Sequence, residues 1–177
     1  PGGPVFLRTG HGSGKHQWGS TCYLLNIFSE GVLERHVYNL VEWSHLVSLG
    51  GLPTSTWAVR EFLLTNAICR CQGYGGMPVV REFRFFVRDC EVESCQPYWP
   101  PGACREGTPD TPGWEESLAT ASRFWRLEER TGLEVLARDA CRAVGGGYWS
   151  VDFLEDWDGE WWLTDMARGE DSFRWEP

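Results

Sequence analysis

The chain has 177 residues and a formal charge of −9, and its 11 Trp, 9 Phe and 5 Tyr make it unusually aromatic. This length is enough for a hydrophobic core, and the aromatic side chains supply apolar area to bury. The acidic balance argues against a general nucleic-acid binder, which would be basic, but allows an anionic small ligand held by a few arginines. No apolar run approaches the ~20 residues of a membrane span, and no signal peptide is visible, so we expect no membrane partner.

Seven cysteines stand at irregular spacing, at positions 22, 69, 71, 90, 95, 104 and 141. They match neither a disulfide framework nor a standard zinc pattern. The odd count indicates free thiols and a reducing compartment, so we expect a cytoplasmic location. A zinc site made by Cys69, Cys71, Cys90 and Cys95 is the alternative that remains open.

The start of the chain predicts a strand over residues 4–8 and then a glycine-rich loop over residues 9–18. Glycines let backbone N–H groups approach an anion, and Arg8 and Lys15 add positive charge. The loop does not fit the P-loop pattern, because only three residues separate Gly10 from Gly14 and His16 follows Lys15. A plain surface loop is the alternative interpretation. Residues 21–27 predict a second strand paired with the first, and residues 30–49 predict a helix with apolar side chains near i, i+3, i+4 and i+7.

The middle of the chain predicts two more strands. Residues 56–64 are rich in β-branched and aromatic side chains, which is typical of a buried strand, although Arg60 and Glu61 interrupt it as an ion pair or as part of a site. Residues 66–78 predict a loop. Residues 79–88 alternate, with Phe83, Phe85 and Val87 on one face and Glu82, Arg84 and Arg88 on the other. The charged face indicates either the wall of a site or a surface in water.

The following residues predict a turn at Asp89, a strand over residues 91–98 and a loop over residues 96–113. Residues 115–144 predict helix, with a break at Thr131 and Gly132. Together with the C-terminal hairpin described next, the element order indicates an α+β fold with mixed sheets.

Two apolar runs near the C-terminus flank Asp158 and Gly159, and this pair favours a tight type I′ hairpin turn. With that pair at the tip, the numbers of facing residues sum to 317, so Asp152 lies opposite Asp165. Their Cβ atoms would be roughly 4.5–5.5 Å apart, a distance at which two carboxylates repel. A magnesium ion would offset the repulsion. A shared proton, or two side chains splayed into solvent, are the alternatives.

Four segments, taken in order, resemble the ATP-grasp family. They are Phe6-Leu7-Arg8 with Ser13-Gly14-Lys15-His16-Gln17-Trp18, Val59-Arg60-Glu61-Phe62-Leu63, Glu82-Phe83-Arg84-Phe85-Phe86-Val87, and Val151-Asp152-Phe153 with Trp162-Leu163-Thr164-Asp165-Met166. The resemblance covers nearly the whole chain. It is nearest to the ATP-grasp proteins of actinobacteria and their phages, and more distant from the eukaryotic chaperone branch that assembles a translation-initiation factor.

The resemblance implies ATP and magnesium bound between two α+β lobes with mixed or antiparallel sheets, residues 1–55 and 56–177. It also implies the absence of the family's N-terminal substrate domain, or its supply by another chain. By this resemblance, phosphate would be bound by Arg8, Lys15 and Arg84. Adenine would be held by Glu61 and the backbone at Phe62 and Leu63, with Arg60 beside them. Magnesium would be bound by Asp152 and Asp165.

Lys15 and Arg84 are also the catalytic candidates that the resemblance implies. The family commonly has asparagine two residues after the second acid, where this chain has Ala167. That departure weakens metal binding or moves a ligand to Glu170, Asp171 or Ser172.

The resemblance leaves three functions open. The first is an ATP-dependent carboxylate–amine ligase that works through an acyl-phosphate on an unidentified small-molecule acid and amine. The second is a non-catalytic or chaperone-like ATP-binding module that docks a partner protein. The third is a structural remnant that binds nothing.

Overall fold

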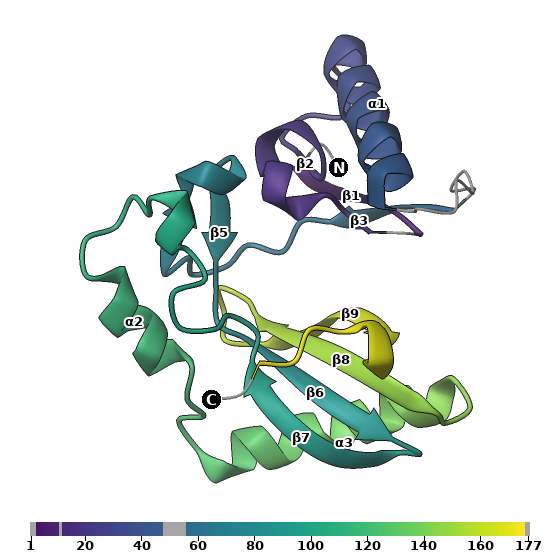
Figure 1. Cartoon of the computed structure of the whole chain (residues 1–177), viewed down its shortest axis with the longest axis vertical. Coiled ribbons are helices and arrows are strands. Elements are labelled where there is room, and N and C mark those ends of the chain that lie inside the picture. Colours follow the sequence, from purple (N-terminus) through teal and green to yellow (C-terminus); the bar gives the residue numbers. More distant parts are fainter. Residues whose placement is uncertain (1–2, 11, 48–55, 176–177) are drawn as a thin grey trace. The chain divides into compact units, whose positions relative to one another are not determined.

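The computed structural model describes residues 3–10, 12–47 and 56–175 (Figure 1). The chain divides into two compact units. The first comprises the described residues up to Leu64, together with Arg70–Pro78 and Cys104–Asp110, and the second comprises Thr65–Cys69, Val79–Ala103 and the chain from Thr111 onward. The first unit therefore includes the segment up to Leu64, which the sequence analysis divided between two lobes at residue 55.

The first unit contains a three-stranded sheet covered by one helix. Its strand order is β2-β1-β3, with β1 Val5–Thr9, β2 Tyr23–Leu24 and β3 Trp57–Glu61, and both neighbours of β1 are antiparallel to it. Helix α1, Glu30–Val47, packs on this sheet through a core of Leu7, Leu24 and Leu40. Leu33, Val37 and Leu40 of the predicted apolar stripe pack in this core, whereas Val47, at the end of the helix, is 48% exposed.

Strands β4, Cys69–Cys71, and β5, Met77–Val79, form a two-stranded sheet. Most of its residues, Arg70–Pro78, belong to the first unit. Three short 3₁₀ helices, η1 Lys15–Ser20, η2 Gln72–Tyr74 and η3 Arg105–Gly107, belong to the first unit. The sequence predicted only a loop over residues 66–78, and that prediction was wrong for β4 and β5. Each of these strands is three residues long, which is too short for alternation to reveal it.

The second unit is built on a four-stranded antiparallel sheet with the order β7-β6-β8-β9. The strands are β6 Glu82–Arg88, β7 Glu91–Pro97, β8 Tyr148–Glu155 and β9 Trp161–Arg168. Helix α3, Leu127–Ala143, packs on one face through Leu133, Ala137 and Cys141 against Phe83, Phe85, Val87, Val151 and Phe153. This confirms the alternation predicted for β6. Helix α2, Trp114–Ala121, precedes α3, and η4, Gly169–Asp171, follows β9.

The hairpin of β8 and β9 confirms that Asp152 lies opposite Asp165, but by a different route. The connection spans residues 156–160, and near it the paired numbers sum to 316, as in Glu155 with Trp161. The register then shifts between Phe153 and Asp152, so Thr164 is an extra residue on β9. Such a bulge changes which residues face each other by one position, which restores the predicted pairing of the two aspartates.

Asp156 organises the connection instead of a two-residue turn. Its carboxylate accepts hydrogen bonds from the backbone N–H groups of Asp158 and Glu160 and from the indole N–H of Trp162. The first two donor–acceptor distances are both 2.9 Å, and Gly159 has a φ of 85°. This is the local chemistry of an Asp-capped loop with glycine in the left-handed region. These bonds hold the pKa of Asp156 below its ordinary value, with the bond from Trp162 as the main cause.

Two further sequence predictions were wrong. Strand β3 is mostly exposed, with Val59 at 63% and Leu64 just beyond the strand at 69%, although its composition predicted a buried strand. Among the strands that the structure describes, it pairs with β1 alone, at the edge of its sheet. The break in the second helical region lies at residues 122–126, between α2 and α3, and helix α3 continues through Thr131 and Gly132.

Cys71 and Cys104 form a disulfide, so the expectation of free thiols was wrong for this pair. None of the helices in the described part of the chain is long and apolar enough to cross a membrane.

Candidate functional site

A row of polar side chains crosses the four-stranded sheet on the face opposite α3. Gln96 of β7 faces Arg84 of β6, Arg84 faces Asp152 of β8, and Asp152 faces Asp165 of β9. Side chains directly opposite one another in a sheet share one face. The fold therefore brings together three predicted site residues, Arg84, Asp152 and Asp165.

Arg84 and Asp152 form a two-pronged ion pair. Nε of Arg84 donates to Oδ1 of Asp152 and Nη2 donates to Oδ2, both at 2.8 Å. The side chains are 13% and 4% exposed. Burial alone would lower the pKa of Arg84, but the bonds and charge of Asp152 outweigh burial and raise the pKa above its ordinary value. The guanidinium also lies 4.7 Å from the ring centre of Tyr98.

Asp165 is half-buried beside this pair, at the position where the bulge brings it back into register. Its Oδ1 accepts a hydrogen bond of 3.0 Å from the backbone N–H of Met166. The hydroxyl of Thr164 donates to the backbone oxygen of Asp152 at 3.3 Å, which links the two strands at the bulge. Two carboxylates on one face are the oxygen ligands that magnesium prefers.

Ser172, one of the alternative third-ligand positions, contacts strand β8 through Ser150. Its hydroxyl is 2.6 Å from that of Ser150, which precedes Asp152 by two residues on the same face of β8. It also donates to the backbone oxygen of Arg168 at 2.9 Å. The other two alternatives, Glu170 and Asp171, are exposed residues of η4.

The segment after η4 lies across this polar face (Figure 1). The backbone oxygen of Phe173 accepts hydrogen bonds from Arg84 at 3.2 Å and from Gln96 at 3.4 Å. Arg174 stacks 4.1 Å from the ring centre of Phe86, and the indole N–H of Trp175 donates to the backbone oxygen of Pro97. Sequence reasoning missed this segment, because nothing in residues 172–175 indicates which surface they contact.

In the first unit, Arg8 and Arg60 lie on one face of the three-stranded sheet. Arg8 faces Ala58 and Arg60 faces Phe6, so the two arginines are diagonal neighbours on the face opposite α1. Glu61 faces Val5, which packs on the α1 side, so Glu61 belongs to the other face of the strand. The structure therefore groups the two predicted cations and separates Glu61 from them.

The glycine-rich loop packs against α1. The hydroxyl of Thr9 lies 3.0 Å from that of Ser44 on the helix, and the hydroxyl of Thr21 donates to the backbone oxygen of Gly14 at 2.8 Å. Gly12 has a φ of 151°, and a Cβ atom there would lie 2.6 Å from the ring of Trp43. The loop is thus fixed by its hydroxyls and by the close approach of glycine to tryptophan.

Lys15 begins η1 directly after Gly14, whose φ is 60°. It is half-buried, and it is the single lysine of the chain. The next residue, His16, stacks on Tyr74 with a distance of 4.7 Å between ring centres. Burial and then the charge of Lys15 lower the pKa of His16.

Phe62 and Leu63 follow β3. The ring of Phe62 packs edge-on against Trp18 and Tyr23, at distances of 5.9 and 4.9 Å between ring centres. The backbone N–H of Phe62 donates to the backbone oxygen of Pro4 at 3.3 Å. In this conformation that N–H is therefore engaged within the unit.

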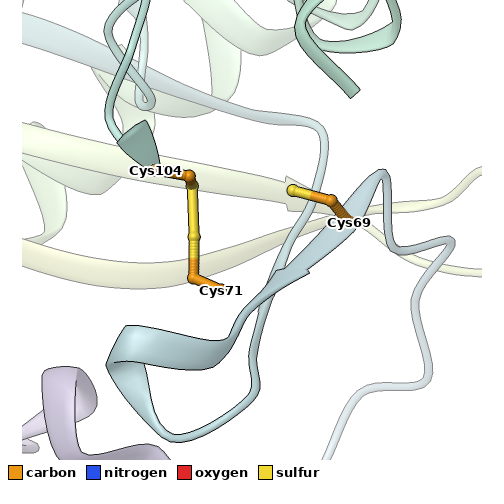
Figure 2. Close-up of side chains that lie close together, drawn as sticks. All are labelled: Cys69, Cys71 and Cys104. Atoms are coloured by element: carbon orange, nitrogen blue, oxygen red, sulfur yellow. A yellow bond between two sulfur atoms is a disulfide. The ribbon is translucent and has the colours of Figure 1, made fainter. Parts of the chain in front are cut away.

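Sequence reasoning also missed a cluster of three buried cysteines, Cys69, Cys71 and Cys104 (Figure 2). Their sulfur atoms all lie within 4.8 Å of one another. The alternative zinc site grouped Cys69 and Cys71 with Cys90 and Cys95 instead, and within the described ranges only the group with Cys104 has metal-ligand spacing. Sulfur of Cys90 lies 3.4 Å from that of Cys141.

No protein-family model matches this chain, and a search of curated proteins finds no match either.

Proposed function

We propose that this protein binds ATP together with magnesium, as an ATP-grasp-type protein with an α+β fold. The observation that carries the proposal is the row of Arg84, Asp152 and Asp165 across one face of the second unit. An arginine beside two carboxylates suits a nucleoside triphosphate, since the arginine pairs with phosphate and the carboxylates hold magnesium.

Arg8, Lys15 and Arg60 supply the remaining positive charge in this proposal. Arg8 and Arg60 share one face of the first sheet, and Lys15 lies at the end of the glycine-rich loop. Lys15 contributes a compact charge to the terminal phosphates, and the planar guanidinium groups each bond two phosphate oxygens. Glu61 and the backbone at Phe62 and Leu63 are proposed to hold adenine.

The activity that we propose first is carboxylate–amine ligation. ATP would transfer its terminal phosphoryl group to a carboxylate, and an amine would then displace phosphate from the acyl-phosphate. Arg84 and Lys15 would position the phosphates and offset their charge, which is the main contribution of a protein to phosphoryl transfer. Phosphate release from ATP and magnesium with candidate amino acids tests this activity, and release that is independent of any acid or amine contradicts it.

A docking module is the second candidate function, and exposed apolar side chains favour it. Strand β9 lies at the edge of its sheet, and Trp162 and Leu163 on it are 49% and 47% exposed. Trp157 in the neighbouring connection is 65% exposed. An edge strand with exposed aromatic side chains is a common docking surface for a partner protein. In this reading the protein binds ATP without transferring phosphate.

ATP is expected to stabilise the protein only when magnesium is present, since the paired carboxylates repel an uncompensated triphosphate. At a hundred times its dissociation constant, the ligand adds about 2.7 kcal/mol to the free energy of unfolding. Thermal melting with ATP alone, magnesium alone and both together measures this gain. Equal shifts from ATP with and without magnesium would contradict the two-carboxylate metal site.

Lys15→Ala is expected to weaken ATP binding more than AMP binding, because Lys15 is assigned to the terminal phosphates. Isothermal titration of both nucleotides measures the difference, and Arg35→Ala, at an exposed position of α1, is the matched control for a lost surface cation. Equal losses for ATP and AMP would remove Lys15 from the phosphate site. Since Lys15 is the single lysine, ATP should also slow its acylation by an amine-selective reagent.

A further inference from the structure

The buried cysteine cluster contains none of the residues proposed for the nucleotide site. Cys69 and Cys71 are two residues apart in strand β4, where both are buried and the intervening Arg70 is exposed. Residues at i and i+2 of a strand project to the same side. The third cysteine, Cys104, directly precedes η3 and is fully buried. Figure 2 shows the three side chains. Their sulfur atoms all lie within 4.8 Å of one another.

Backbone contacts hold Cys104 near β4 without help from the sulfur–sulfur bond. The backbone N–H of Arg70 donates to the carboxylate of Asp110 at 2.8 Å, and the backbone N–H of Asp110 donates to the oxygen of Arg70 at 3.2 Å. Cys71 and Pro109 form an isolated β-bridge. A Cβ atom on Gly107 would lie 3.3 Å from Cβ of Cys71, so glycine lets the two segments approach closely. We therefore expect the three sulfurs to stay together after the disulfide is reduced.

We propose that the reduced chain binds one zinc ion through the sulfurs of Cys69, Cys71 and Cys104. Thiolates favour zinc, and they are poor ligands for magnesium. At a Zn–S distance of about 2.3 Å, tetrahedral sulfurs are about 3.8 Å apart, which fits the observed cluster. A water molecule takes the fourth position.

The zinc–thiolate site has a net charge and depends on the redox state of its cysteines. Three thiolates and Zn²⁺ carry a net charge of −1, and Arg70 and Arg105, adjacent in sequence to the ligands, offset it. The disulfide and the zinc site are alternative states of the same sulfurs. A dithiol reductant transfers two electrons and two protons to the disulfide, becoming oxidised itself, and leaves Cys71 and Cys104 as thiols. Zinc binding then releases up to three protons from the cysteines.

Cobalt titration of the reduced full chain tests the site. The protein is reduced with a dithiol without oxygen, the dithiol is removed, and Co²⁺ is added as a spectroscopic substitute for zinc. We expect sulfur-to-cobalt charge-transfer absorption that saturates at one Co²⁺ per chain, with bands typical of tetrahedral coordination, and loss of these bands when zinc is added. Absence of saturable charge-transfer absorption would overturn the proposal.

Cys69→Ser separates the metal site from the disulfide, because it removes one ligand and leaves Cys71 and Cys104. Its Co²⁺ affinity should fall by more than about tenfold, the lower end of what even an outer-shell partner contributes. Mass spectrometry after alkylation, without reduction, should still find the disulfide, which reports that the fold around the cluster is intact. Cys22→Ala, at a buried cysteine outside the cluster, should bind like the wild type. Wild-type affinity in Cys69→Ser, or an equal loss in both variants, would overturn the assignment.

Discussion

Asp152→Asn is expected to lower the free energy of unfolding of the nucleotide-free protein by about 3 kcal/mol, because it leaves a buried arginine without its counter-charge. Arg84 donates two hydrogen bonds of 2.8 Å to the Asp152 carboxylate, and both side chains are largely buried. Removing one partner of a buried ion pair costs roughly 3–5 kcal/mol, and asparagine keeps one acceptor oxygen, which places the loss at the lower end. Urea unfolding of the variant and the wild type measures it.

Asp165→Asn is the matched variant on the neighbouring strand. The change at Asp165 leaves the Arg84–Asp152 ion pair in place and relieves repulsion between two carboxylates, so its effect on stability should be smaller than that of Asp152→Asn. The same variant should lose the magnesium-dependent gain from ATP. If Asp165→Asn destabilises the protein as much as Asp152→Asn, both carboxylates are structural and the metal site is misassigned. Full ATP response in Asp165→Asn would also contradict the metal site.

The ion pair has a consequence for the proposed magnesium site. Arg84 bonds both carboxylate oxygens of Asp152, so a metal ion that binds Asp152 has to displace at least one of those hydrogen bonds. A phosphate group beside the ion would accept the displaced guanidinium hydrogen bonds. This exchange explains why magnesium and ATP are expected to bind together and each weakly alone.

The hairpin shows what local sequence chemistry predicts well. Alternation and the Asp158–Gly159 pair predicted the pairing of Asp152 with Asp165, which the structure confirms, although the register near the connection differs. They were not sufficient for the turn, because the bonds that Asp156 makes to the backbone favour a longer connection, and the bulge at Thr164 then compensates. The longer connection shifts the strand register by one residue and the bulge shifts it back, so the predicted pairing of the two aspartates is correct.

The features that sequence reasoning missed depend on contacts between distant residues. Cys71 and Cys104 are 33 residues apart, and only the path of the chain around Asp110 brings them together. Likewise, no periodicity in residues 172–175 indicates that the Phe173 oxygen accepts a bond from Arg84. The exposure of β3 follows from its place at a sheet edge, which depends on the whole topology and not on its own composition.

The break between α2 and α3 has a specific tertiary cause. Arg81, only 5% exposed, donates to the backbone oxygens of Ala121 and Arg123 at 3.3 and 2.9 Å, so it bonds the last residue of α2 and a residue just beyond it. Its guanidinium also lies 3.9 Å from the ring centre of Trp125. Sequence reasoning placed the break at Gly132 because glycine is a weak helix former, but tertiary contacts outweighed that preference.

Arg81→Met is expected to lower the free energy of unfolding by about 3 kcal/mol, because methionine fills the space but leaves two carboxylates unpaired. Arg81 donates to Glu129 at 2.6 and 2.8 Å and to Glu155 at 3.0 Å, and these glutamates are 15% and 16% exposed. Arg88→Met is the control on the same strand region. Arg88 is 50% exposed in its pair with Glu93, so solvent screens this pair and its loss should cost much less than the loss of Arg81. Similar losses in both variants would contradict a special role for Arg81.

Acid titration of the same variants gives a second, independent test of Arg81. Burial would raise the pKa of Glu129, but hydrogen bonds from Arg81 and from the backbone N–H of Trp125 outweigh it and hold the pKa below the ordinary value of 4.5. The stability from this pair is therefore fully present above pH 4.5 and is lost as the pH falls through the lowered folded-state pKa. Burial has the opposite outcome at Glu155, whose pKa is raised because desolvation outweighs the charge of Arg81.

The stability difference between wild type and Arg81→Met should consequently shrink as Glu129 becomes protonated, whereas the difference for Arg88→Met stays small throughout. A difference for Arg81→Met that is constant from neutral pH to below the Glu129 pKa would show that packing, and not the ion pair, accounts for the loss.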